Sequence, residues 1–357
     1  MSMEGKMDRR NFLKGAAAIG AAALLPDVTV SDMQEKLEAA RVPTALEKRF
    51  GSRMEFDGNA TDIIDIQPEQ PSDKPDILVA PGFNASIHTN APVLEMLAKD
   101  GRRVMSLNHP HAGRSLRESA DSKESRAKFP LTELRKASNL LDLIDAKSPE
   151  KPVDCFAFSE GALNTMLAAY LHPEKFNSII LSAPAGLIGD DSLITLAGLQ
   201  NKESGGLMQR FSAQSESDNA AARLPAYSSD EALRQEEMEM FKHIASTWEA
   251  DEETAKKHLV ATIEDLWALS HMRIDDMVAF VRAAGVKVAV ISGVEDKVFP
   301  TERMARRLPK DSLDGFMATQ GAHGPHYSAR AITYIFGLLD AKREKEREER
   351  AAAKQNQ

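Results

Sequence analysis

The stretch of sequence that decides the fold is residues 155–163, which read CFAFSEGAL. An apolar run typical of a buried strand leads directly into Ser159, and a helical pattern follows at once. Ala157 and Gly161 stand two residues before and after the serine, where a strand and a helix that meet in a sharp turn need small residues. The stretch favours a nucleophile elbow, which exposes a serine oxygen above a sheet and points the backbone N–H of Glu160 at a developing oxyanion. A serine that only caps the helix is the alternative.

The segments on both sides of this turn alternate between strand and helix. Short apolar runs predict strands at 77–80, 103–107, 153–158, 178–181 and 286–291, and helical patterns lie between them at 92–99, 131–146 and 160–171. Continuous apolar runs are typical of parallel strands, because these are buried on both faces. The sequence therefore predicts an α/β fold with a mostly parallel central sheet flanked by helices, preceded by an antiparallel hairpin at 53–56 and 62–66.

The N-terminus carries the pattern of an export signal. Arg9 and Arg10 precede Phe-Leu-Lys and then an Ala- and Gly-rich segment at 15–25, which resembles a bacterial twin-arginine signal. An Ala-rich cytosolic helix is the alternative. The segment is shorter than the roughly 20 apolar residues that a membrane span needs. We therefore expect export to the periplasm through the twin-arginine translocase, with no membrane span in the mature chain.

Composition limits the partners of the chain. Its 357 residues are 42% hydrophobic and 28% charged, which is enough for a sizeable core. The formal charge of −9, with no basic domain, disfavours nucleic acid as a partner. Cys155 is the only cysteine, so no internal disulfide can form, and its apolar surroundings predict a small buried residue.

One segment interrupts the alternation of strands and helices. Residues 187–270 hold helical patterns rich in Met, Leu, Phe and Trp and no convincing strand, which predicts a helical insertion. The predicted organisation is a signal segment at 1–30, a first part of the core domain at 31–186, the insertion at 187–270, a second part of the core at 271–340 and a charged helical tail at 341–357.

The candidate nucleophile needs a base, because a serine hydroxyl is a weak nucleophile while it keeps its proton. His323 stands in the sequence QGAHG after a strand-like run at 315–319. Its small neighbours allow a loop to bring the imidazole close to Ser159. His326, three residues later, is the alternative base.

A third group must hold that imidazole in the correct tautomer and stabilise its cation. Asp296 follows a predicted strand and is the favoured candidate. Glu295 is its neighbour, and Asp190 or Asp191 follows the preceding strand, so these remain alternatives. The favoured candidates occur in the chain order Ser, Asp, His.

Over residues 50–340 the chain resembles the serine hydrolases of the α/β-hydrolase superfamily, whose triads have this order. Residues 80–83, Ala-Pro-Gly-Phe, resemble the oxyanion loop after the third strand, where His-Gly is more usual. The resemblance implies that the backbone N–H of Phe83 is the second oxyanion donor. Residues 293–300 match the loop that carries the acid, and the insertion at 187–270 falls where this superfamily carries its cap.

Residues 108–115 resemble the superfamily's Asp-x-Pro-Gly-His-Gly-x-Ser loop, with departures at Asn108 and His111. His109 and His111 form a pair of potential metal ligands. No convincing third ligand stands nearby, so we expect a packing role for this loop and no metal.

The resemblance implies a serine hydrolase that needs no cofactor and cleaves a carboxylic ester, or a related acyl bond, of a small molecule through an acyl-enzyme on Ser159. A proline-iminopeptidase-like enzyme and a C–C bond hydrolase are alternatives within the same fold. A non-catalytic ligand-binding protein is a further alternative, because fold does not fix function.

Overall fold

The computed structural model describes eleven stretches of the chain, which together contain the whole central sheet. They are residues 49–56, 59–83, 91–109, 132–188, 265, 268–269, 271–296, 298–308, 311–319, 323 and 329–355. The predicted signal segment at 1–30 and most of the predicted cap at 187–270 lie outside them.

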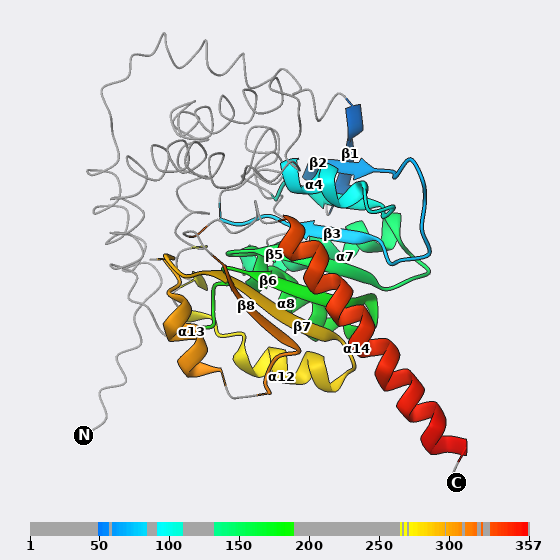
Figure 1. Ribbon diagram of the computed structural model, residues 1–357. Helices are drawn as coiled ribbons and strands as arrows, with labels where there is room; N and C mark the ends of the chain where they lie inside the picture. Colours follow the sequence, from blue (N-terminus) through cyan, green and yellow to red (C-terminus); the bar gives the residue numbers. More distant parts are fainter. Residues whose placement is uncertain are drawn as a thin grey trace, which may run out of the picture.

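Eight strands form one sheet in the order β1-β2-β4-β3-β5-β6-β7-β8 (Figure 1). The strands are β1 (Gly51–Phe56), β2 (Asn59–Ile66), β3 (Ile77–Ala80), β4 (Val104–Leu107), β5 (Val153–Phe158), β6 (Phe176–Ser182), β7 (Lys287–Gly293) and β8 (Gly315–Thr319). β2 runs antiparallel to β1 and β4, and every other neighbouring pair is parallel. The predicted hairpin and the predicted parallel strands are confirmed.

Helices cover both faces of the sheet. They are α4 (Ala91–Ala98), α7 (Thr132–Lys147), α8 (Gly161–Leu171), α12 (Asp275–Ala283), α13 (Thr301–Arg307) and α14 (Ala329–Gln355), with a 3₁₀ turn at Pro173–Lys175. α7, α8 and α12 pack together on one face, and α4 and α14 pack against each other on the opposite face (Figure 1). The sequence predicted α4, α7 and α8 and did not anticipate α12 or α13.

Two apolar cores lie between these layers. Leu140 of α7, Met166 of α8 and Val278 of α12 belong to the core on one face, whereas Leu94 of α4 and Ile335 of α14 belong to the core on the other. Every residue of β3, β4 and β5 is buried, as expected of central strands covered on both sides. The parallel strands therefore direct their carboxyl ends to one edge of the sheet, and Ser159 follows the carboxyl end of central β5.

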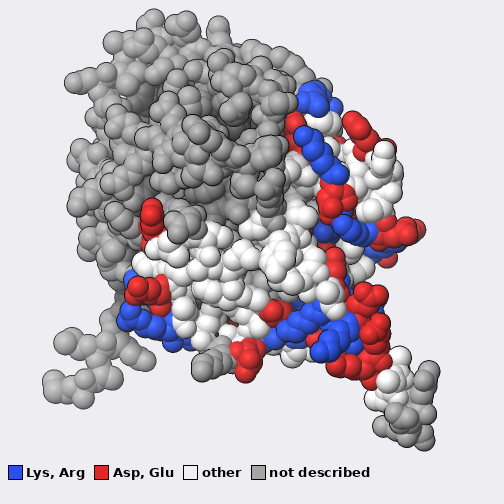
Figure 2. All heavy atoms as spheres, viewed as in Figure 1, with Lys and Arg blue, Asp and Glu red and all other residues white. Residues whose placement is uncertain are grey.

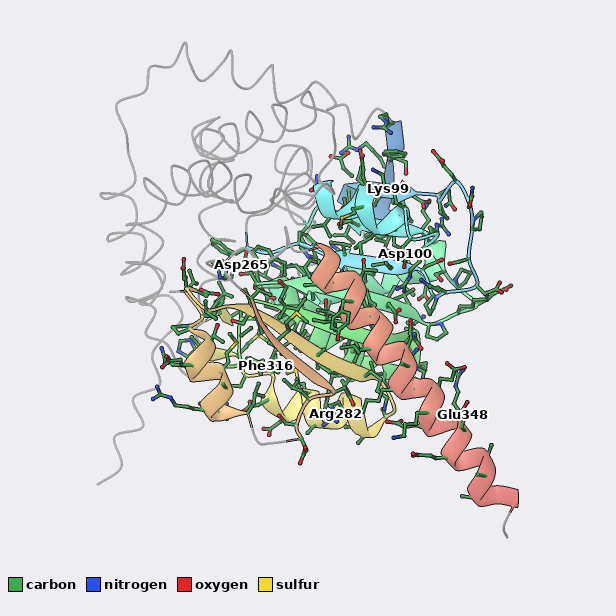
Figure 3. All side chains as sticks on the ribbon, viewed as in Figure 1. Lys99, Asp100, Asp265, Arg282, Phe316 and Glu348 are labelled. Carbon is green, nitrogen blue, oxygen red and sulfur yellow. The ribbon has the colours of Figure 1, made fainter. Side chains whose placement is uncertain are left out.

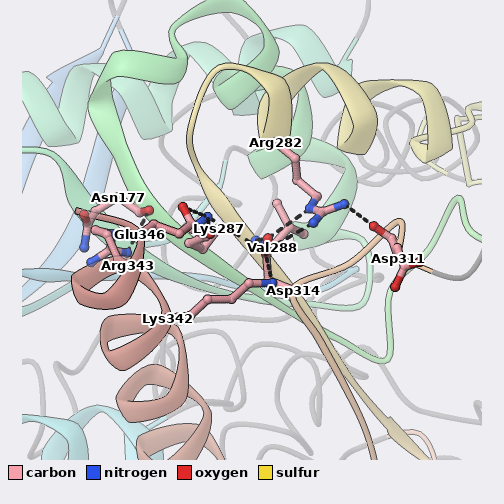
Figure 4. A network of polar contacts seen from close by, with 9 residues as sticks. All are labelled: Asn177, Arg282, Lys287, Val288, Asp311, Asp314, Lys342, Arg343 and Glu346. Carbon is pink, nitrogen blue, oxygen red and sulfur yellow. Dashed lines mark hydrogen bonds and ion pairs between the residues drawn. The ribbon is translucent and has the colours of Figure 1, made fainter. Parts of the chain in front are cut away.

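A polar network, which we call the Asp314 network, joins α12, β7 and α14 at the opposite, amino-terminal ends of β7 and β8 (Figure 4). The Asp314 carboxylate accepts hydrogen bonds from Arg282 at 2.9 and 3.2 Å, from Lys342 at 2.6 Å and from the Val288 backbone N–H at 2.9 Å. Lys287 lies 4.0 Å from the same carboxylate. The network thereby fixes α14 to the edge of the sheet.

Charges of both signs are mixed along α14 and the neighbouring elements on the face shown in Figure 2. Within the described ranges, the structure has no helix with the length and apolar character that crossing a membrane requires.

Candidate active site

Ser159 occupies a strained turn between β5 and α8. Its φ angle is +53°, in the left-handed region that non-glycine residues rarely adopt. The Ser159 N–H donates a 2.8 Å hydrogen bond to the carbonyl of Ser182 on neighbouring β6, which holds the turn against the sheet. The side chain is nearly buried, with 5% of the residue exposed. The sharp strand-to-helix turn predicted for this stretch is therefore present.

The small residues around this turn are required by close approach. A β-carbon at Gly161 would lie 2.6 Å from the carbonyl oxygens of both Ala80 and Pro81, so a larger residue would push α8 away from β3. A β-carbon at Gly82 would lie 3.1 Å from the β-carbon of Ser159. The loop after β3 thus lies directly against the serine, and this loop carries Phe83, the predicted second oxyanion donor.

His323 lies between the serine and an acidic residue. Its Nε2 is 3.0 Å from Ser159 Oγ, and its Nδ1 is 3.0 Å from Asp296 Oδ2. The rings of Phe158 and Phe299 flank the imidazole, with centroids 5.4 and 5.3 Å away. These contacts fix the ring so that one nitrogen faces the serine and the other faces the carboxylate.

Asp296 is held in turn by the backbone that follows it. Its Oδ1 accepts hydrogen bonds from the N–H groups of Val298 at 2.8 Å and Phe299 at 2.9 Å, and its Oδ2 is left to face His323. The neighbouring Glu295 is exposed. The alternative base His326 and the alternative acids Asp190 and Asp191 lie outside the described residues.

Glu160 sends its side chain into a buried group of charges, which we call the Lys136 cluster. The Lys136 Nζ lies 3.0 Å from a Glu160 oxygen, 2.9 Å from an Asp265 oxygen and 3.5 Å from a Glu133 oxygen. All four side chains are at most 6% exposed. The cluster joins α7, the residue after Ser159 and the segment before α12. Figure 3 shows Asp265 at one end of the sheet and Arg282, which belongs to the Asp314 network, at the other.

The pKa values in this cluster depart strongly from ordinary ones. Burial raises the pKa of Glu133 to about 7 and that of Glu160 to about 8, although the charge of Lys136 opposes both shifts. Burial alone would lower the pKa of Lys136, but the three carboxyl groups outweigh it and raise that pKa. The cluster therefore holds a charged lysine among more carboxyl groups than one lysine neutralises, and the surplus carboxyl groups retain protons near neutral pH.

The carboxyl groups of Glu133, Glu160 and Asp265 each bring an oxygen within 4.8 Å of the others, a spacing that could hold a metal ion. The Lys136 ammonium lies against all three of them, so the positive charge that a cation would supply is already provided by the protein. His111 lies outside the described residues, and His109 is buried. Its Nε2 contacts the Asn164 amide at 3.4 Å, and burial followed by the charge of Lys136 lowers its pKa well below the ordinary value.

Sequence reasoning treated Glu160 as a backbone donor only and did not anticipate Lys136 or Glu133. A local signal for them exists, because Lys136, Leu140 and Ile144 recur at helical spacing and all three are buried. A lysine on a buried helix face requires buried partners. Nothing local could have named Asp265 as one of them.

Comparison with known proteins shows the family. The model of the serine aminopeptidase S33 family matches residues 71–326, so the chain belongs to this family of α/β-hydrolases and is a hydrolase. The twin-arginine signal model matches residues 6–26, which supports export to the periplasm through the twin-arginine translocase. No curated protein matches the chain.

Solved structures share the fold at low sequence identity. A hydrolase from Pseudomonas aeruginosa PA01 is 14% identical with a TM-score of 0.55, over 81% of this chain and 98% of that one. A carboxylesterase structure from the thaumarchaeon Nitrososphaera gargenis is 16% identical with a TM-score of 0.51, over 83% and 100%. A meta-cleavage product hydrolase from Pseudomonas fluorescens IP01 is 15% identical with a TM-score of 0.51, over 84% and 99%. These similarities confirm the predicted α/β-hydrolase fold.

Proposed function

We propose that the chain is a serine hydrolase that cleaves a carboxylic ester or a related acyl bond of a small molecule, through an acyl-enzyme on Ser159. One observation carries the proposal. Ser159 Oγ, the His323 imidazole and the Asp296 carboxylate form a continuous chain of contacts, each 3.0 Å long. This is the arrangement in which an imidazole can remove a serine proton while a carboxylate stabilises the resulting cation.

In the proposed reaction, Ser159 Oγ bonds to the acyl carbon as its proton moves to His323 Nε2. The carbonyl oxygen becomes negatively charged and is stabilised by the N–H groups of Phe83 and Glu160. The N–H of Glu160 is available for this role because the first N–H groups of a helix lack partners within the helix. His323 then gives the proton to the leaving oxygen, the bond from carbon to that oxygen breaks, and Asp296 keeps the imidazole oriented.

Water completes the cycle in the same geometry. His323 removes a proton from the water, whose oxygen attacks the acyl carbon of the Ser159 ester. When the tetrahedral adduct collapses, the proton returns to Ser159 Oγ and the carboxylic acid is released. No cofactor takes part in these steps.

The proposal is tested with a fluorophosphonate probe, which bonds only to an activated serine. We expect the full-length chain to be labelled at Ser159, with no labelling of Ser159→Ala. His323→Ala and Asp296→Asn should each lower kcat for p-nitrophenyl esters by roughly three orders of magnitude or more, because a triad acts as a unit. Labelling of Ser159→Ala at the wild-type rate would disprove the assignment, and tight ligand binding with neither labelling nor turnover would favour the binding-protein alternative.

The family match favours one second candidate, hydrolysis of an aminoacyl amide, because the family is described as serine aminopeptidases. The same serine, histidine and aspartate would carry out that reaction with an amine as the leaving group. Comparing kcat/KM for p-nitrophenyl esters of rising chain length with that for aminoacyl naphthylamides separates the two. Faster turnover of the proline naphthylamide than of every ester would reject the esterase proposal in favour of a proline-iminopeptidase-like activity.

A further inference from the structure

The Lys136 cluster lies immediately behind the proposed oxyanion donor. Glu160 follows Ser159 directly in the chain, and the peptide between these two residues carries the N–H that the mechanism needs. The Glu160 side chain extends into the protein interior, where its carboxyl group contacts the Lys136 ammonium at 3.0 Å. The carbonyl of the same peptide accepts hydrogen bonds from the N–H groups of Ala162 at 3.1 Å and Ala185 at 3.2 Å, and the anchored Glu160 side chain restrains the N–H side of the peptide further.

Lys136 is suited to fix it because the lysine is itself immobilised. Its ammonium also contacts Asp265 at 2.9 Å and Glu133 at 3.5 Å, and Glu133 lies one turn earlier on the same helix. His109, two residues after β4, is near enough for the charge of Lys136 to add to the effect of burial in lowering its pKa. The ammonium thus contacts carboxyl groups from α7, the elbow and the segment before α12, and these contacts leave it little freedom.

Stability alone does not account for the cluster. Four buried charged or polar side chains carry a large desolvation cost, and apolar residues of similar volume often stabilise a protein as well or better. The α7 face that carries Lys136 also carries Glu133 one turn earlier and continues with the apolar Leu140 and Ile144. An apolar residue at position 136 would extend that packing but would leave the Glu160 side chain without its buried partner.

We infer that Lys136 is a positioning residue of the reaction, which holds the Ser159–Glu160 peptide in the orientation that receives the oxyanion by anchoring the Glu160 side chain. The inference rests on the proposed function. It assigns to Lys136 no contact with the substrate, so its loss should impair the chemical step and leave substrate binding largely intact.

The test is a double-mutant cycle on ester hydrolysis with Lys136→Met and Glu160→Ala. Each single variant should lower kcat about 10- to 100-fold, up to the roughly 100-fold cost of a misplaced group and below that of a lost oxyanion donor, with KM changed less than about threefold. The double variant should be no slower than the worse single variant, because both changes break the same link. Glu160→Gln keeps an acceptor oxygen that can face Lys136 and should therefore lower kcat less than Glu160→Ala does.

Asp154→Asn is the matched control. It breaks another buried ion pair, between Asp154 and Arg102, at the start of β5, the strand that precedes Ser159. Measured below the thermal midpoint of each variant, this control should keep the wild-type kcat. If Lys136→Met lowers the midpoint as Asp154→Asn does and leaves kcat within twofold of wild type, or if the two changes in the cycle add fully, the inference is overturned.

Failure of the inference can be told apart from failure of the proposed function. If the wild-type chain neither turns over esters nor reacts with the fluorophosphonate probe, the proposed function fails and this inference fails with it. If the wild-type chain reacts and Lys136→Met reacts at the same rate, only the positioning role is rejected. Glu160→Gln is nearly isosteric and should fold, so a loss of kcat in this variant as large as that in Glu160→Ala would also contradict the role.

Discussion

The Lys136 cluster and the Asp314 network both combine carboxyl groups with cationic side chains, but the pKa values of their carboxyl groups shift in opposite directions. In the network, burial raises the pKa of Asp314, but hydrogen bonds from Arg282, Lys342 and the Val288 N–H outweigh it and lower that pKa to about 2. In the cluster, burial raises the pKa of Glu160 to about 8 although Lys136 lies beside it.

The difference shows what decides the ionisation of a carboxyl group inside this protein. Asp314 has several cations to itself, and the partners Arg282 and Lys342 reach solvent, with 24% and 41% of their side chains exposed. Glu133, Glu160 and Asp265 share one lysine, and all of them are buried. The number of cations for each carboxyl group, and their access to water, therefore sets the direction of the shift.

The largest expected effect is that of removing the single cation of the cluster. Lys136→Met should lower the free energy of unfolding by about 3 kcal/mol, since loss of one partner from a buried ion pair leaves its counter-charge without compensation. Urea unfolding of the full-length chain at pH 7 measures this. A loss no larger than that from Lys342→Met, whose ammonium is one of several donors to Asp314, would remove the distinction between the two regions.

The next effect is the pH dependence of the cluster. The folded-state pKa values of Glu133 and Glu160 are raised from 4.5 to about 7 and about 8, so the native chain retains protons that the unfolded chain has lost. Stability should therefore fall as pH rises from about 5 to 8, by at most about 1.4 kcal/mol per pH unit for each retained proton. Urea unfolding across this range should show a clearly smaller fall in Glu160→Gln, and parallel curves for the two proteins would contradict the protonated state of Glu160.

A smaller effect of opposite sign is expected at the Asp314 network. The folded-state pKa of Asp314 lies below its unfolded value, so its contribution to stability is present above pH 4 and is lost as pH falls toward 2. Asp314→Asn should reduce the free energy of unfolding by about 1 kcal/mol at pH 7, after allowance for the exposed partners, and the difference from wild type should vanish near pH 2.

Asp311→Asn provides the control for that measurement. Asp311 is exposed, and its backbone carbonyl accepts a hydrogen bond from the Arg282 guanidinium. The substitution preserves this carbonyl. Its φ of +71° is one that asparagine also tolerates. A difference from wild type that persists unchanged at pH 2 in Asp314→Asn would show that packing, and not charge, links α14 to the sheet.

The smallest effect sets the baseline for both regions. Arg306 and Glu302 pair at 2.8 Å on α13, with 78% and 83% of their side chains exposed. Glu302→Gln should change the free energy of unfolding by less than about 0.5 kcal/mol, because water and salt screen an exposed pair. A change in the free energy of unfolding as large as that of Asp314→Asn would mean that burial does not make an ion pair contribute more to stability than an exposed one.

The sequence predicts the fold and the Ser159 turn well, because both depend on local patterns. Apolar runs such as 153–158 identify the strands, and the small residue at Gly161 is required by contact with the end of β3. His323 and Asp296 are also found, because each follows a strand in a recognisable loop and the chain order restricts the choice. The structure brings these two residues to Ser159, and their catalytic roles remain a proposal.

The Lys136 cluster could not be predicted in the same way. Its members come from α7, from the turn after β5 and from residue 265, which has no sequence pattern that links it to the others. Their proximity depends on how two helices and a distant segment pack. The pKa shifts depend on that packing too, since an exposed Glu160 would ionise like any other glutamate.

The positive φ angle of Ser159 lowers the stability of the fold at the position that carries the proposed nucleophile. A residue with a side chain in the left-handed region costs roughly 1–2 kcal/mol relative to the right-handed one, whereas glycine adopts either with little penalty. A glycine would therefore hold the same turn with less strain and would remove the hydroxyl that His323 faces. Stability of the fold alone therefore does not explain a serine at this angle, whereas the proposed reaction requires its hydroxyl.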